Sequence, residues 1–172
     1  MDKLAWRNIG RFVLLMLFQL LVLNNVYLGG YVLPLLFVLF ILMLPTNLKR
    51  IPLLLIAFGT GLTADLMSNV LGFHALACTV VAMLRIWFAN RILTRGEPVV
   101  ISTPSVRSVT PQIYVSYLLL MYTAYYLIYF TSELFGSRGF GDVILATLLS
   151  ALASTLLAVL YRILFIKKEN TI

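Results

Sequence analysis

Three ionisable residues stand inside otherwise apolar stretches of the chain, at Asp65, His74 and Arg85. A charge inside a membrane helix costs about 2.5–3.5 kcal/mol, so each is expected to have a partner. Only a short turn separates Asp65 from His74, which makes a carboxylate–imidazole contact feasible. We expect Asp65 to be held by His74 or by a nearby hydroxyl such as Thr63. Arg85 lies three helical turns beyond His74, and we expect it to reach the cytoplasmic headgroups, with pairing to Asp65 as the alternative.

Familiar catalytic and metal-binding patterns are missing from the sequence. His74 and Cys78 stand four residues apart, but there is no second histidine and no carboxylate cluster beside them. Cys78 is the only cysteine, which excludes an intramolecular disulfide and favours a small buried apolar side chain. There is no P-loop and no G-x-S-x-G motif. We therefore predict no enzymatic activity, no metal and no cofactor.

The elements that must position these residues are apolar runs of membrane-spanning length. The 172 residues are 62% apolar and 11% charged, against about 45–50% and about 25% in soluble domains. A spanning helix needs roughly 17–25 residues, and Pro52 and Pro111 mark helix starts. Pro34 is expected to kink the second run, and the first two runs could instead be tilted or short helices. We predict a single all-α membrane domain over 1–172, with spans near 10–26, 29–46, 51–69, 72–93, 111–134 and 141–166.

The placement of positive charge predicts the orientation. Lys and Arg are retained on the cytoplasmic side of a membrane, and they gather before the first run, after the second, around the fourth-to-fifth loop and after the sixth. The opposite connections hold only Arg138. Both termini are therefore expected in the cytoplasm, and the net charge of +7 reflects topology and not a nucleic-acid partner. The first run lacks a cleavage site, so we interpret it as a retained helix.

Small residues and tyrosines indicate how the helices pack. The sixth run has a seam of small residues four apart, at Ala146, Ser150, Ser154 and Ala158, and the third run pairs Ala57 with Gly61. Such spacing lets helix backbones approach closely in lipid. The fifth run holds six tyrosines, which we interpret as interior packing with local hydroxyl bonds; lining a cavity or an interface is the alternative.

One segment carries a family resemblance. Gly-Leu-x-x-Asp-Leu at 61–66 is followed by Leu-Gly-Phe-His-Ala-Leu at 71–76, and this pair of motifs resembles the signature of the rod shape-determining protein MreD family. The resemblance implies that Gly61, Gly72, Asp65, His74 and Arg85 are structural or recognition residues. It also implies a non-catalytic subunit of the bacterial cell-elongation complex in the cytoplasmic membrane. The implied partners are MreC and, through it, MreB, RodA and a class B penicillin-binding transpeptidase.

The same resemblance supplies an alternative function. Members of that family are similar in fold to the S subunits of energy-coupling-factor transporters, which bind vitamins. Those subunits resemble one another in an Ala-x-x-x-Ala motif on the first helix, and the first run here has no alanine between Phe12 and Leu21. Vitamin uptake is therefore the alternative function, ranked after the elongation subunit. A third, a lipid-handling enzyme or flippase that uses Asp65 and His74 as acid and base, would need a polar cavity.

Overall fold

The described part of the chain is built from α-helices, as expected. The computed structural model describes residues 3–21, 32–44, 48–70, 72–93, 111–133 and 139–166. Its helices are α1 (Lys3–Leu21), α2 (Phe37–Met43), α3 (Arg50–Ser68), α4 (Phe73–Leu93), α5 (Pro111–Glu133) and α6 (Phe140–Ile166). The prediction of an all-α fold is confirmed for these residues, and α5 begins at Pro111 as the sequence predicts.

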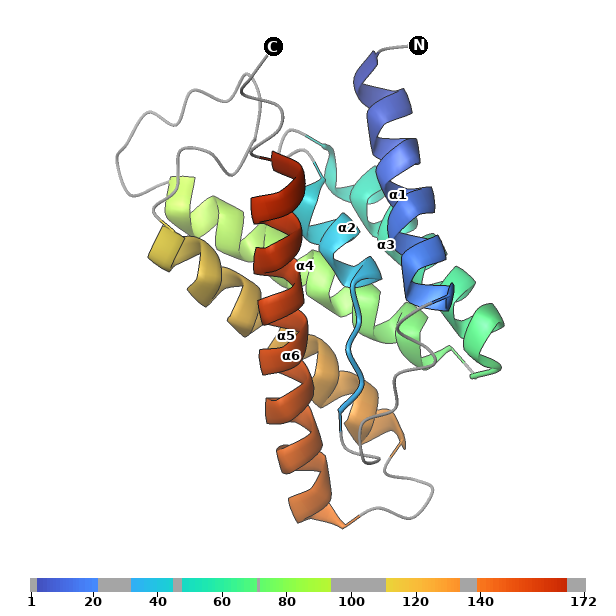
Figure 1. Cartoon of the computed structure of the whole chain (residues 1–172), viewed down its shortest axis with the longest axis vertical. Coiled ribbons are helices and arrows are strands. Elements are labelled where there is room, and N and C mark those ends of the chain that lie inside the picture. The colour runs from blue at the N-terminus through green and yellow to red at the C-terminus, as the bar shows by residue number, and fades with distance from the viewer. Residues whose placement is uncertain are drawn as a thin grey trace.

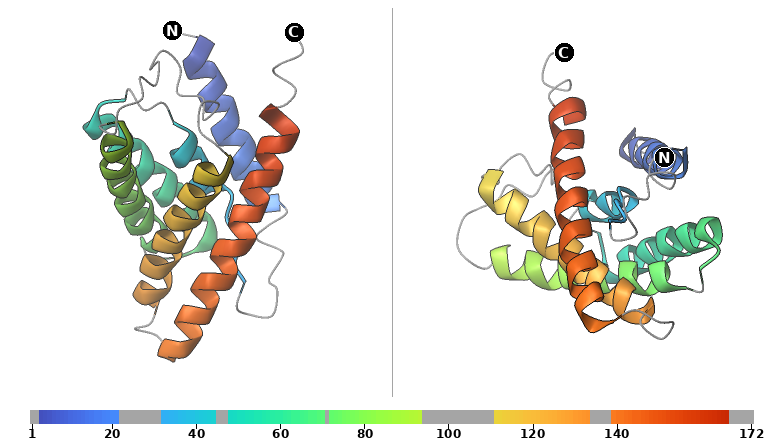
Figure 2. Two further views of the ribbon diagram at one scale, coloured as in Figure 1. Left: turned by 90° about the vertical axis from the view of Figure 1, so that its left-hand side faces the viewer. Right: turned by 60° about the horizontal axis from the view of Figure 1, so that its bottom comes forward.

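Successive helices alternate in direction (Figure 1). The start of α1, the end of α2, the start of α3 and the end of α6 lie at one end of the molecule, which we call the basic end because Arg50 begins α3 and Lys49 precedes it. The start of α6 lies at the opposite end (Figure 2), and the α3–α4 turn lies at the side of the molecule, between the two ends. Helices α3 and α4 pack closely, as do α5 and α6, and α4 also packs on α5.

Among the described residues, three helices are long and apolar enough to cross a membrane, Arg50–Ser68, Gln112–Glu133 and Phe140–Leu164. Two further apolar helices, Asn8–Leu21 and Phe73–Phe88, are shorter. Large apolar side chains cover the outside, including Ile51, Leu66 and Phe140, which are each more than 70% exposed. Polar residues such as Asp65 and Ser150 are buried. Polar side chains buried beneath an apolar surface suit a protein that is solvated by lipid.

The second predicted span is not a continuous helix in its described part. Residues 32–35 run as extended, non-helical chain, Leu36 already has right-handed helical backbone angles, and α2 then covers only seven residues. Pro34 lies in the extended segment and does not kink a helix. Proline lacks an amide hydrogen and disfavours the helical conformation of the residue before it, so the helix begins only at Phe37. The rest of the predicted span, 29–31 and 45–46, lies outside the described residues.

Candidate functional site

Asp65 holds the beginning of α4 from the last turn of α3. One carboxylate oxygen, Oδ1, accepts a hydrogen bond from the His74 amide, and Oδ2 accepts one from the Ala75 amide, each at 2.9 Å. The first amides of a helix have no partner within it and carry partial positive charge, which favours an anion there. Asp65 is only 3% exposed, so these bonds form away from solvent. The carboxylate therefore acts as a cap that joins two neighbouring helices.

The turn between these helices brings the two amides to Asp65. Asn69 ends α3 in the left-handed conformation with φ 54°, and Val70 donates its amide hydrogen to the Asp65 carbonyl oxygen at 3.1 Å. Gly72 has φ +77°, which glycine adopts without the steric cost that a side chain brings. The Gly72 carbonyl oxygen then accepts the Leu76 amide at 3.0 Å, in the first turn of α4. Gly72 is thus required by the backbone path.

Gly61 allows α3 and α4 to touch backbone to backbone. It lies four residues before Asp65, on the same face of α3. A Cβ placed on Gly61 would lie 2.5 Å from the His74 carbonyl oxygen and 2.7 Å from the Ala75 nitrogen. Real side chains essentially never approach so closely. The absence of a side chain at Gly61 thus sets the distance at which Asp65 reaches the α4 amides.

The His74 imidazole points to α5 and not to the carboxylate. Its Nδ1 atom and the Tyr125 hydroxyl form a hydrogen bond of 2.5 Å. The ring stacks on Tyr129, with centroids 4.5 Å apart, and meets the edge of Phe37. The expected pair of Asp65 and His74 is therefore correct at the level of the residues, but the contact uses the His74 backbone amide. Thr63 does not hold Asp65, because its hydroxyl donates to the Thr60 carbonyl oxygen at 2.7 Å.

Arg85 lies inside the bundle, so the expectation that it reaches the headgroups is wrong. It is 5% exposed and donates a hydrogen bond to the Leu44 carbonyl oxygen, just after the end of α2. The Tyr117 hydroxyl lies beside the same guanidinium. The last carbonyl groups of a helix lack intrahelical partners and carry partial negative charge. The short α2 thereby provides Arg85 with an internal partner, which is neither a lipid headgroup nor Asp65.

The predicted seam on α6 faces the interior. Ala146, Ser150, Ser154 and Ala158 are all fully buried. The two hydroxyls also accept hydrogen bonds from the extended segment, Ser150 from the Leu33 amide and Ser154 from the Leu35 amide, both at 3.0 Å. The small residues therefore make room for extended backbone and also satisfy its polar groups, which the spacing alone did not indicate.

Two further side chains complete the support of the extended segment. The Tyr126 hydroxyl donates to the Leu33 carbonyl oxygen at 2.6 Å. The Gln19 amide group accepts the Leu36 amide hydrogen at 2.8 Å and donates to the Pro34 carbonyl oxygen at 3.2 Å. Non-helical backbone at membrane depth is tolerated only where protein satisfies it. Gln19 was not among the predicted site residues, although an amide side chain in the middle of an apolar run was a usable signal.

The tyrosines of α5 fill the centre of the bundle. Tyr122, Tyr125 and Tyr126 are fully buried, and the rings of Tyr125 and Tyr126 meet edge to face with centroids 5.4 Å apart. Cys78 is buried in the same core. The bonds of the Tyr125 and Tyr126 hydroxyls to His74 and Leu33 agree with the interpretation as interior packing.

The chemistry available at this site is hydrogen bonding between helices. Both Asp65 oxygens are engaged with backbone amides, and the His74 ring is bonded to α5. In the part of the chain that the structure describes, no three His, Cys, Asp or Glu residues come together as metal ligands. Comparison of the chain with protein-family models, curated proteins and solved structures found no match.

Proposed function

We propose that this protein is a non-catalytic membrane subunit of the bacterial cell-elongation complex, of the MreD type, that supports cell shape and peptidoglycan synthesis by binding partners. The main observation behind the proposal is that the Asp65 side chain binds backbone amides of the neighbouring helix. The motif that resembles that family forms a rigid junction in which the carboxylate binds the His74 and Ala75 amides. The conspicuous residues of the motif thus position two helices, as a subunit that acts by its shape requires.

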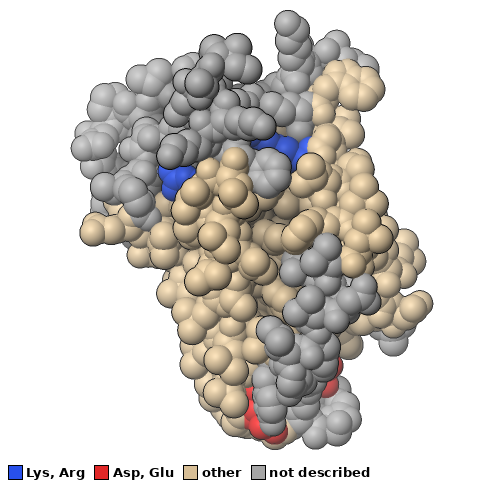
Figure 3. Space-filling view, viewed as in Figure 1, with Lys and Arg blue, Asp and Glu red and all other residues tan. Residues whose placement is uncertain are grey.

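The distribution of charge supports an orientation with both termini in the cytoplasm. The Lys and Arg side chains visible in Figure 3 lie towards the basic end of the molecule, and the Asp and Glu side chains lie at the opposite end. Glu133 ends α5 and Asp142 lies in the first turn of α6, at that opposite end. Basic residues are retained in the cytoplasm. We therefore assign the basic end to the cytoplasmic face of the bacterial inner membrane.

Six crossings are compatible with the short α2. The four extended residues 32–35 cover about 13 Å at about 3.3 Å each, and Leu36 with the seven residues of α2 adds about 12 Å at 1.5 Å each. Together they approach the hydrocarbon thickness of about 30 Å. The segment 32–43 can thus cross most of the bilayer, first as extended chain and then as helix, and the remaining crossings follow α1, α3, α4, α5 and α6.

The partners proposed from the family resemblance are MreC and, through it, MreB, RodA and a class B penicillin-binding transpeptidase. Because the motif residues point inward, partner contact belongs to the outer faces of the helices that they hold. On α3 that face carries Leu55, Leu62 and Leu66, all exposed. A substitution that disturbs the contact of Asp65 with α4 would displace this outer face of α3. The motif could thus affect partner binding although its residues do not contact the partner.

The two alternative functions, a vitamin-binding S subunit and an acid–base enzyme, would each require a different interior from the one observed. A vitamin-binding S subunit needs space for its substrate, whereas the rings of Tyr122, Tyr125 and Tyr126 fill the middle of the described helices. An acid–base enzyme needs reacting groups that can face a substrate, whereas the Asp65 oxygens face α4 amides. These observations favour the elongation subunit.

Affinity purification from native bacterial membranes tests the proposal. We expect the tagged full-length chain to retain cell-wall elongation proteins, and a deletion strain to lose its rod shape. Recovery of a pair of ATPases and a transporter subunit would instead identify an S subunit. A chain that retains neither set, in cells that keep their shape without it, would contradict the proposed function.

A further inference from the structure

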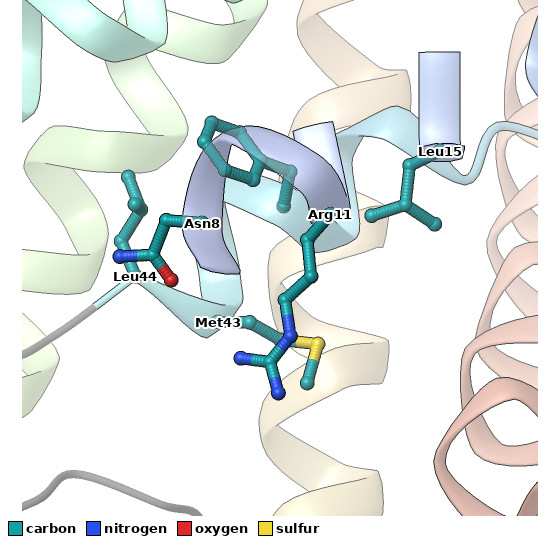
Figure 4. A pocket seen from close by; sticks show the side chains of 6 residues that line it. Asn8, Arg11, Leu15, Met43 and Leu44 are labelled. Carbon is teal, nitrogen blue, oxygen red and sulfur yellow. The ribbon is translucent and has the colours of Figure 1, made fainter. Parts of the chain in front are cut away.

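We draw no further inference here: the strongest candidate, the hollow between α1 and the end of α2 that Asn8, Arg11 and Met43 line together with Leu15, Phe40 and Leu44 (Figure 4), carries nothing, because the last three side chains are buried and nothing in the structure shows room there for a ligand.

Discussion

The Asp65 side chain binds the backbone amide of His74 at 2.9 Å, while the imidazole of the same histidine turns away to the Tyr125 hydroxyl. His74 of α4 thus binds α3 through its backbone amide and α5 through its side chain. Ala75 adds the second amide to the carboxylate. This arrangement makes the junction sensitive to the loss of either a charge or a hydrogen-bond acceptor, and it leads to the first prediction.

Asp65→Asn should destabilise the protein, and Asp65→Leu should do so more. An asparagine offers one acceptor oxygen where two amides need partners, and a leucine offers none. Each buried amide left without a partner costs about 1–3 kcal/mol. Melting in detergent should place Asn between wild type and Leu, with Thr63→Val as a control that removes a neighbouring hydroxyl. Cell-shape activity should fall in parallel with stability. Complete loss of activity in Asp65→Asn, at normal stability and with partners retained, would point to chemistry at this residue.

Gly61→Ala should separate α3 from α4. The added methyl group would meet the backbone of His74 and Ala75, which cannot move as a flexible side chain can. Overpacking of this kind costs about 1–3 kcal/mol. Gly59→Ala is the matched control, since nothing lies within 4 Å of a Cβ there, and it should be neutral or slightly stabilising. Equal melting temperatures for the two variants would show that the helices do not touch at Gly61.

Ser154→Ala should weaken the attachment of the extended segment to α6. The substitution removes the acceptor of the Leu35 amide and a partner of the Tyr126 hydroxyl, at a cost of about 1–3 kcal/mol for the buried donor. Ser154→Leu should be worse, because it also overfills a fully buried position. Ser116→Ala, at an exposed position of α5, is the control. If all three variants melt together with wild type, these hydroxyls do not support the segment.

Topology can be read from reporter fusions. Fusions after Ile172 and within 94–110 should report the cytoplasm, because both regions carry basic residues of the kind that are retained there. Fusions near Gly30 and Gly136 should report the outer side. A cytoplasmic signal near Gly30 would show that the segment 32–43 does not cross the membrane. A periplasmic signal from the tail would exclude an even number of crossings.

The all-helical class, the approximate positions of α3, α4, α5 and α6 and the residues on which the site depends could be predicted from the sequence, whereas the first helix begins at Lys3 and not near residue 10. These features are local. Run length, proline position and the rarity of Asp65, His74 and Arg85 among apolar neighbours can be read without knowing what packs against what. The inward face of α6 also followed from the spacing of Ala146 to Ala158.

The partner of each buried polar group depends on the tertiary packing and could not be predicted. Arg85 finds a carbonyl 41 residues away at Leu44, and the Leu33 amide finds Ser150, 117 residues away. A hydropathy profile shows that a polar side chain in an apolar helix is unfavourable, but it does not indicate which hydrogen-bond partner compensates for its burial. The non-helical segment before α2 also depends on distant partners. Pro34 permits extended backbone there, and Gln19, Tyr126 and the α6 hydroxyls form hydrogen bonds with its backbone polar groups inside the bundle. These hydrogen-bond partners belong to segments that are distant in sequence, and the packing of the helices brings them together.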